Sequence, residues 1–188
     1  MTASSTSRKL TYQDFLAFPD DGRRHELIDG MHYVTPSPVT PHQRVVGNLY
    51  FLIRLHLEQH GGGEIFPSPF DVVFSFFDVV EPDLLYVSDA RKPIVTHKHV
   101  RGSPDLVIEV LSPATRRRDE GVKLALYDRS DVVEYWVIDP ERETVRAYRR
   151  DGAHLCVATE LENSADAELH SPLFPGMALP LRKLFGRQ

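Results

Sequence analysis

Cysteine is almost absent from this sequence, and long apolar runs are missing altogether. Its 188 residues include a single cysteine, Cys156, which excludes an internal disulfide bond and a metal site built from several cysteines. We expect Cys156 to be buried within the segment "HLCVAT". No run approaches the roughly 20 apolar residues of a membrane span, and the start, "MTASSTSRKL", lacks the apolar centre of a signal peptide. The sequence thus predicts a cytoplasmic protein without a membrane partner.

Several catalytic motifs are lacking as well. The segment "HELID" has no second histidine, so it is not the HExxH helix of a zinc protease. The sequence contains no GxGxxG, Walker A or GxSxG pattern, which removes support for dinucleotide binding, P-loop chemistry and serine hydrolysis. The formal net charge of −5 provides no general attraction to nucleic acid, although 22 lysines and arginines can still form a local basic face.

The pattern of elements predicts an α/β (mixed α+β) fold. "RRHELIDGMHYV" indicates a hairpin that turns at Asp29-Gly30, and "TPHQRVVGNLYFLIRLHLEQH" indicates an amphipathic helix. Strands are expected in "EIFPSPFDVVFS", "VVEPDLLYVS" and "PDLVIEVLS"; a polar loop, "PATRRRDE", a helix, "GVKLALYDRS", and the paired strands "VVEYWVIDP" and "ETVRAYRR" follow. We expect a mixed β-sheet flanked by helices with an extra N-terminal hairpin. Residues 1–10 should be flexible, and residues 11–188 should form a single domain.

Carboxylates interrupt two segments that otherwise have the composition of buried strands. Asp83 follows a proline in "EPDLL", and Asp105 follows another in "SPDLVIEV", where Glu109 lies among apolar residues. Because side chains alternate along a strand, Asp105 and Glu109 share one face. If the two strands are neighbours, Asp83 and Glu109 converge and repel each other, and a divalent cation would relieve that repulsion. Mg²⁺ or Mn²⁺ held in this way is typical of metal-assisted phosphodiester hydrolysis.

Basic residues follow the Glu109 segment. Lys123 begins the next predicted helix, where it could position an attacking water and offset growing negative charge. Arg116, Arg117 and Arg118 lie between Glu109 and Lys123 on the predicted loop, and three adjacent arginines suit a DNA phosphate backbone.

Each of these residues also has a purely structural interpretation. Asp83 could begin a strand as a turn residue, and Glu109 could be a core glutamate paired with an arginine. Lys123 could pair with Asp119 four residues earlier on a solvated helix face. Arg116–Arg118 could be a solvated run of charge. The combination of these residues, more than any one of them, favours the functional interpretation.

The same residues carry a resemblance to a known family. "RRHELIDGMHYV", "PSPVTPHQRVVGNL", "EPDLLYVS", "GSPDLVIEVLSPATRRRD", "KLALYDRSDVVEYWVIDP" and "SPLFPGMALPLRKLF" resemble the large bacterial family of Uma-type putative restriction endonucleases, part of the PD-(D/E)xK nuclease superfamily. The resemblance extends from about Tyr12 to Phe185 and implies a restriction-endonuclease-like core.

The resemblance also implies roles for individual residues. Asp83 matches the aspartate of the motif and Glu109 its acidic residue, both as metal ligands. The motif lysine would fall on Leu111, and Lys123 on the next helix takes its place. Glu26, in "HELIDG", matches an acidic position that approaches the catalytic site. Asp105 matches a further position, which we assign to a supporting role near the metal ion.

Two functions from different classes follow from these observations. The first is a Mg²⁺-dependent DNA endonuclease, acting as a homodimer because a duplex has two strands to cut and two-fold dimers are the commonest oligomers. The second is a catalytically silent protein that keeps the nuclease fold for DNA binding or regulation, which the displaced lysine and the acidic net charge favour. A two-carboxylate glycosidase is less consistent with the sequence, which lacks an aromatic-rich sugar cleft.

Overall fold

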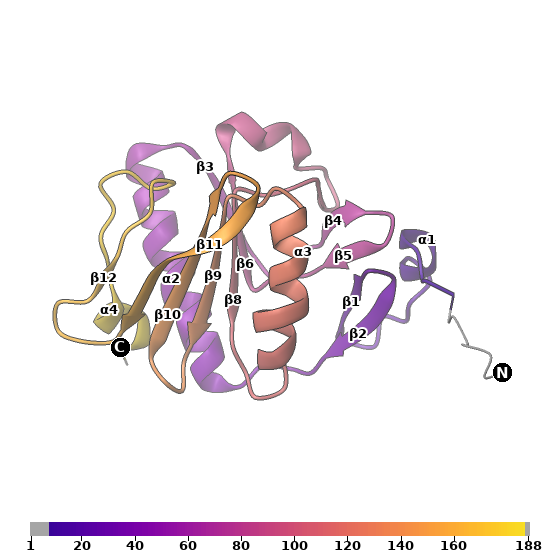
Figure 1. The fold of residues 1–188 in the computed structure, drawn as a ribbon, viewed down its shortest axis with the longest axis horizontal. Coiled ribbons are helices and arrows are strands. Elements are labelled where there is room, and N and C mark those ends of the chain that lie inside the picture. The colour runs from indigo at the N-terminus through magenta and orange to yellow at the C-terminus, as the bar shows by residue number, and fades with distance from the viewer. Residues whose placement is uncertain (1–7, 187–188) are drawn as a thin grey trace.

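The computed structural model describes residues 8–186, and its largest element is a six-stranded mixed sheet (Figure 1). The strand order is β11-β10-β9-β8-β6-β3, in which β8 and β9 run parallel and the other neighbours run antiparallel. The bounds of these strands are β3 (Gly63–Pro67), β6 (Leu84–Ser88), β8 (Leu106–Val110), β9 (Glu134–Asp139), β10 (Thr144–Asp151) and β11 (His154–Glu162).

A second sheet lies beside the first and contains the N-terminal hairpin (Figure 1). Its order is β2-β1-β5-β4-β7, and β1 and β2 meet at the Asp29-Gly30 turn as the sequence predicts. The bounds are β1 (Arg24–Ile28), β2 (Met31–Thr35), β4 (Val72–Ser75), β5 (Asp78–Val80) and β7 (Val100–Arg101). A short pair, β12 (Glu168–Leu169) and β13 (Leu179–Pro180), completes the strands of the described residues.

Helices cover both faces of the six-stranded sheet. Helix α2 (Thr40–His60) packs with α4 (Leu181–Phe185) on one face. Helix α3 (Leu124–Arg129) lies on the other face, next to the smaller sheet. Helix α1 (Tyr12–Phe15) and a 3₁₀ helix (Asp89–Ile94) are peripheral. The predicted mixed α/β fold with flanking helices and an extra hairpin is thus confirmed.

Proline explains why two predicted strands are each divided between the two sheets. The segment expected as one strand, "EIFPSPFDVVFS", contains Pro67 and Pro69 and becomes β3 and β4. The segment "VVEPDLLYVS" contains Pro82 and becomes β5 and β6. Because proline has no amide hydrogen to donate to a ladder, the chain leaves one sheet at these positions and enters the other. The predicted strands are therefore divided between two sheets, which meet at the residues around Pro82.

The helical segment after β8 begins earlier than the sequence suggests. Residues 116 and 117 are already helical, and a π-helical turn occupies Arg118–Lys123 before α3 begins. The arginines predicted to lie on a loop therefore lie on the first turns of a helix. The wider π turn is a rare local structure that often occurs at functional sites.

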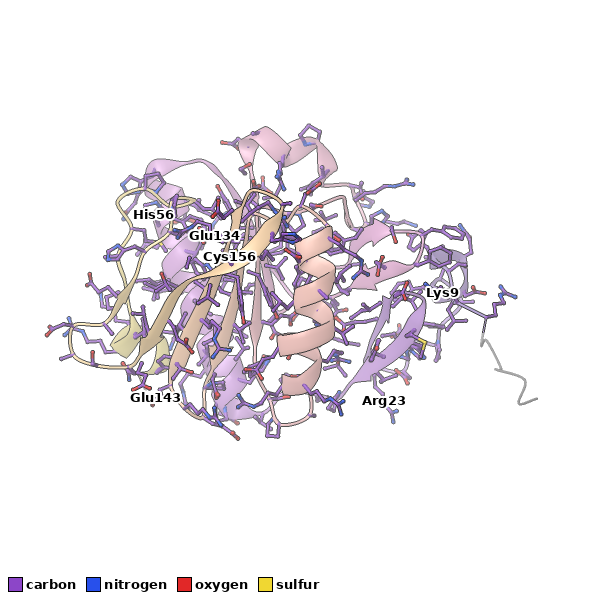
Figure 2. All side chains as sticks on the ribbon, viewed as in Figure 1. Lys9, Arg23, His56, Glu134, Glu143 and Cys156 are labelled. Carbon is purple, nitrogen blue, oxygen red and sulfur yellow. The ribbon has the colours of Figure 1, made fainter. Side chains whose placement is uncertain are left out.

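Three further expectations concern the ends and the surface. Most of the segment 1–10 lies outside the described residues, and Leu10 donates its amide to the Gly30 carbonyl at 2.9 Å. Cys156 is exposed on β11 rather than buried, because β11 is the edge strand of its sheet (Figure 2). Within residues 8–186, no helix is both long and apolar enough to cross a membrane.

Candidate active site

Two predicted carboxylates lie next to each other where the two sheets meet. Asp83 directly precedes β6, and Glu109 lies within β8. These strands pair antiparallel with Leu84 opposite Ile108, so the next step of the register brings Asp83 opposite Glu109. Leu84 and Ile108 point into the core beneath α2, and alternation therefore directs both carboxylates to the α3 face. The predicted adjacency of the two strands is confirmed.

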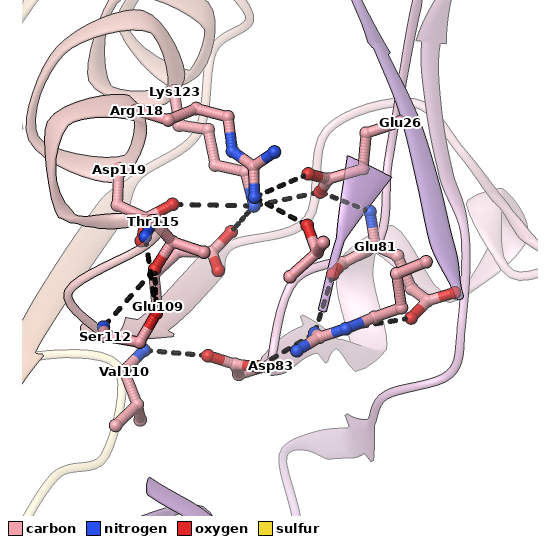
Figure 3. A network of polar contacts seen from close by, with 12 residues as sticks. Glu26, Glu81, Asp83, Glu109, Val110, Ser112, Thr115, Arg118, Asp119 and Lys123 are labelled. Carbon is pink, nitrogen blue, oxygen red and sulfur yellow. Dashed lines mark hydrogen bonds and ion pairs between the residues drawn. The ribbon is translucent and has the colours of Figure 1, made fainter. Parts of the chain in front are cut away.

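Lys123 lies at the centre of a buried acidic cluster (Figure 3). Its Nζ lies 2.8 Å from Glu109 Oε1, 2.9 Å from Glu26 Oε1 and 3.8 Å from Asp119 Oδ1. All four side chains are at most 4% exposed. Burying one charge costs several kcal/mol unless partners compensate it, and here the hairpin, the sheet and the π turn supply those partners together.

The π turn and α3 determine which side chains reach Glu109. Asp119 and Lys123 are four residues apart, and both point inward from this turn. One turn later, the Tyr127 hydroxyl donates to Glu109 Oε1 at 2.8 Å. The lysine and the tyrosine thus approach the same carboxylate oxygen from one helical surface, while Glu26 approaches the lysine from β1.

Electrostatics in this cluster favour a charged lysine and a protonated glutamate. Burial raises the pKa of Glu109 to about 8, against the opposing effect of Lys123 and with support from the neighbouring carboxylates. Burial alone would lower the pKa of Lys123, but the carboxylates raise it well above its usual value. Burial also opposes ionisation of Glu26, yet Lys123 and Arg118 lower the pKa of Glu26. The cluster therefore contains three carboxyl groups around one lysine, so its carboxyl groups outnumber the positive charge of Lys123.

Asp83 has different surroundings from Glu109. Its Oδ1 accepts a hydrogen bond from Arg24 at 2.9 Å, and its Oδ2 accepts one from the Val110 amide at 2.8 Å. His42 Nε2 lies 3.0 Å from the same Oδ2. Burial opposes the charge, but the contacts with His42 and Arg24 lower the pKa of Asp83 to about 2. Asp83 is thus ionised over the whole neutral range.

Glu81 is a third acid at the junction of the sheets. Its Oε1 lies 3.6 Å from Arg24 Nε, and burial raises its pKa to about 7 against the effect of Arg24. The Glu81 amide donates to Glu26 Oε1 at 3.1 Å, which links the Asp83 contacts to the lysine cluster.

Most of these groups line one cavity of about 170 Å³; the charged residues on its floor are Arg24, Glu81, Asp83, Glu109, Arg118, Asp119 and Lys123. Its mouth is formed by two connections, residues 36–39 between β2 and α2 and residues 112–114 after β8. The mouth carries no charged side chain, whereas the floor is highly charged. The residues that form the mouth are Pro36, Ser37, Pro38, Val39, Ser112, Pro113 and Ala114.

The three predicted DNA-binding arginines have unequal surroundings. Arg116 lies 2.7 Å from Asp139, and Arg118 donates to Thr35 Oγ1 at 2.6 Å and lies 3.5 Å from Glu26. Arg117 is exposed, and no ion-pair partner occurs for it within residues 8–186. The structure therefore separates the three arginines into two with acidic partners and one directed to solvent.

Asp105 is not part of the cluster, contrary to its predicted place near a metal ion. It precedes β8 at the end opposite Glu109, about 13 Å away at 3.3 Å per residue. Its Oδ2 accepts the Ser88 amide at 2.7 Å, and its Oδ1 lies 3.3 Å from Arg91. The shared face is consistent with the alternation rule, but four residues of strand separate the two carboxylates. Asp105 connects strand ends and is omitted from the candidate site.

Several residues of the site were not identified as site residues from the sequence: Arg24, His42, Glu81, Asp119 and Tyr127. Arg24 and Glu81 become neighbours of the site only because the second sheet meets the first there. The signal for His42 was present, because a polar residue at the start of an amphipathic helix lies on its buried face, next to Val45.

The donor set suits a hard divalent cation. Both hydrogen bonds from Lys123 and Tyr127 to Glu109 use Oε1, and Glu26 Oε2 and Asp119 Oδ1 are buried without a hydrogen-bond partner. In the described range 8–186, no three His, Cys, Asp or Glu side chains are arranged to hold a metal ion by themselves. Mg²⁺ needs only one or two carboxylates and keeps several waters, so a pair such as Asp83 and Glu109 is enough in number for it.

Comparisons with known proteins support a nuclease fold. Residues 12–182 match the Uma2 family, which is described as "Putative restriction endonuclease". A crystal structure of a putative nuclease of the DUF820 family from Anabaena variabilis aligns with a TM-score of 0.78 at 21% sequence identity. The alignment covers 94% of this chain and 97% of that chain. None of the curated proteins compared with the sequence matches it.

Proposed function

Because the chain belongs to the Uma2 family of putative restriction endonucleases, we propose that it is a Mg²⁺-dependent DNA endonuclease. The observation that carries the proposal is the position of Asp83 opposite Glu109, with Lys123 2.8 Å from Glu109 at the floor of one cavity. In the proposed reaction, water adds to the phosphorus of a phosphodiester and one P–O bond breaks. The departing oxygen receives the proton.

Asp83 and Glu109 would hold the cation, Mg²⁺ or Mn²⁺. When bound, the cation supplies Lewis-acid activation of water and neutralises charge at the phosphate. Lys123 positions the attacking water and offsets charge on the phosphate. Glu26 contacts the Lys123 ammonium and fixes its place. The excess of acid in the cluster supports this assignment, because a cation would favour the ionised form of Glu109.

Arginines near the cavity would contact the DNA backbone. Arg118 lines the cavity, and Arg117 next to it is exposed. Arg116 is less available to bind a phosphate because it already pairs with Asp139 and Glu141. Replacing Arg117 with alanine should therefore weaken DNA binding and its salt dependence more than replacing Arg116, since each phosphate contact contributes about 0.9 to the log–log slope.

A cleavage assay with several DNA substrates tests the proposal. Wild-type protein should cut supercoiled plasmid or single-stranded circular DNA in Mg²⁺ or Mn²⁺. Lys123→Met should lower cleavage by about 10²-fold or more while DNA binding in Ca²⁺ persists, because a group that stabilises developing charge is lost. Lys92→Ala is the matched control, since Lys92 is exposed and pairs only with Glu64. Loss of cleavage in both variants would contradict the role of Lys123.

One observation favours the second function, a catalytically silent DNA-binding or regulatory protein. Asp83 already accepts hydrogen bonds on both oxygens, and Lys123 is surrounded by three carboxylates. In such a protein these ion pairs would be purely structural. DNA binding by wild type without cleavage of any substrate in Mg²⁺ or Mn²⁺ would favour this function over the first.

We also propose a two-fold homodimer, since two-fold dimers are the commonest oligomers and a duplex has two strands to cut. Light scattering at micromolar concentration measures this directly. A mass equal to the 21.4 kDa chain would contradict the proposal.

A further inference from the structure

An apolar groove adjoins the catalytic cavity. It has a volume of about 870 Å³ and lies between β2 and the helical segment that begins at residue 116. Ala114 and Arg118 line both the groove and the cavity, so the two hollows lie next to each other. The walls of the apolar groove are Tyr33 and Val34 on one side and Gly121, Val122 and Ala125 on the other.

The groove combines apolar surface with positive charge. Val122 is 40% exposed, although it is a large apolar residue, and the Tyr33 side chain shares the face of β2 on which Glu26 contacts Lys123. The Arg118 guanidinium lies over the Tyr33 ring, 5.5 Å from its centroid. Arg117 also lines the groove, and no carboxylate does so. This combination suits an anionic ligand that also has flat apolar surface.

The cavity restricts the shape of that ligand. Asp83 and Glu109 are each only 3% exposed, and the mouth above them contains Pro36, Pro38 and Pro113, whose rings restrict the backbone. A phosphodiester must enter this narrow mouth to reach the two carboxylates. A stiff duplex keeps its bases stacked inside and bends only at an energetic cost, whereas a single strand can place one phosphate in the cavity and an unstacked base beside it.

Building on the proposed nuclease function, we propose that the substrate is nucleic acid unpaired at the cleavage point. An unstacked base next to the scissile phosphate occupies the apolar groove against Val122 and Tyr33. Arg117 binds the phosphate of that nucleotide. Stacking platforms next to a positively charged track are the usual way in which proteins hold single strands without reading their sequence.

Binding measurements in Ca²⁺ test this inference separately from catalysis. A labelled short single-stranded oligonucleotide and its blunt duplex are titrated with wild-type protein at one salt concentration. We expect the single strand to bind at least about tenfold more tightly, the effect of about one stacked base. Val122→Asp and Ala125→Asp, both exposed residues on the helical wall, should each remove most of this preference. Val157→Asp is the matched control, because Val157 is 55% exposed on β11 outside the groove.

The outcomes separate the inference from the proposed function. Equal or tighter binding of the blunt duplex, or equal losses in Val122→Asp and Val157→Asp, overturns the inference. Cleavage of the duplex as fast as of the single strand in Mg²⁺ also overturns it but leaves the endonuclease in place. Preferred binding of the single strand without cleavage supports the inference and contradicts the endonuclease. Absence of any binding overturns both.

Discussion

The two ends of β8 each carry a buried carboxylate, but the two carboxylates have different surroundings. At the first end, Asp105 accepts the Ser88 amide, contacts Arg91 and takes part in the backbone bonding that joins β6, β8 and β9. At the other end, Glu109 faces further acids, a cavity and a single buried lysine. At the first end, Arg91 balances the charge of the carboxylate. At the second end, carboxyl groups are in excess and a cavity adjoins them.

This difference indicates where stability and chemistry are located. A carboxylate whose partners are backbone amides and an arginine has its charge balanced by the protein, and it stabilises the fold without a cation. A carboxylate whose pKa rises to about 8 is poorly matched by its protein neighbours and gains from a cation that enters the cavity. Acidic side chains in a cleft whose pKa values are strongly shifted are therefore better candidates for catalysis than buried acidic side chains in general.

The largest expected effect distinguishes the two ends by activity. Glu109→Gln should lower DNA cleavage by at least about 10²-fold, because a proposed metal ligand and its charge are lost. Asp105→Ala should retain cleavage per folded molecule. The rates are measured in Mg²⁺ with Glu162→Gln, an exposed position on β11, as the control. Equal losses in Glu109→Gln and Asp105→Ala would end the distinction between the two ends.

The second prediction concerns Asp83, which lines the cavity. Like Asp105, it has an arginine and a backbone amide that balance its charge. Its pKa is lowered to about 2 from 3.8, so its stabilising effect is fully present above pH 3.8 and is lost as pH falls through about 2. At neutral pH, Asp83→Asn should therefore lower the free energy of unfolding by on the order of 2 kcal/mol. Denaturant unfolding without metal measures this.

Asp131→Asn is the matched control, since Asp131 is exposed and has a positive φ of 56° that asparagine tolerates. If Asp83→Asn is as stable as this control, the contacts of Asp83 with Arg24 and His42 contribute little. The repulsion that the sequence predicts between Asp83 and Glu109 would make Asp83 destabilising without a metal ion, whereas its contacts with Arg24 and His42 predict the opposite.

The sequence predicted much of the fold because its signals are local. The Asp29-Gly30 turn, the apolar stripe of α2 and the alternation along β8 each depend on neighbouring residues only. The second sheet was missed because Pro67 and Pro82 redirect the chain through long-range pairing, which periodicity does not report. The sequence pattern predicts one strand in each of these two segments, although the two halves of each segment lie in different sheets.

The candidate site was predictable only in part for the same reason. Asp83, Glu109 and Lys123 interrupt apolar patterns and could be found along the chain. Arg24 reaches Asp83 from a strand 59 residues earlier, so no local pattern indicates the contact. Asp105 lies away from Glu109, because alternation specifies the face of a strand but not the distance along it.

The third prediction measures what the matched end of β8 contributes to folding. Asp105→Ala leaves the Ser88 amide without its acceptor and Arg91 without its carboxylate. The free energy of unfolding should fall by about 1 kcal/mol, the lower end of the range for an unsatisfied polar group, since the Arg91 side chain is 32% exposed and keeps its bond to the Ser103 carbonyl. Glu109→Gln should not lower the free energy of unfolding at pH 7, because glutamine resembles the protonated glutamate and, unlike wild type, needs no proton uptake on folding. A loss in Glu109→Gln would mean that its ion pair with Lys123 stabilises the fold.

The fourth prediction concerns how stability changes with pH, and no longer its value at one pH. With a pKa of about 8 in the folded protein and an ordinary value of 4.5, Glu109 holds a proton in the folded state that the unfolded chain releases between these values. Its contribution to stability therefore falls as pH rises from about 4.5 to about 8, by at most about 1.4 kcal/mol per pH unit. Without metal, Glu109→Gln should lose this part of the slope, while Asp105→Ala should keep it. An unchanged slope in Glu109→Gln would show that the proton resides elsewhere, with Glu81, whose pKa is about 7, as the next residue to replace.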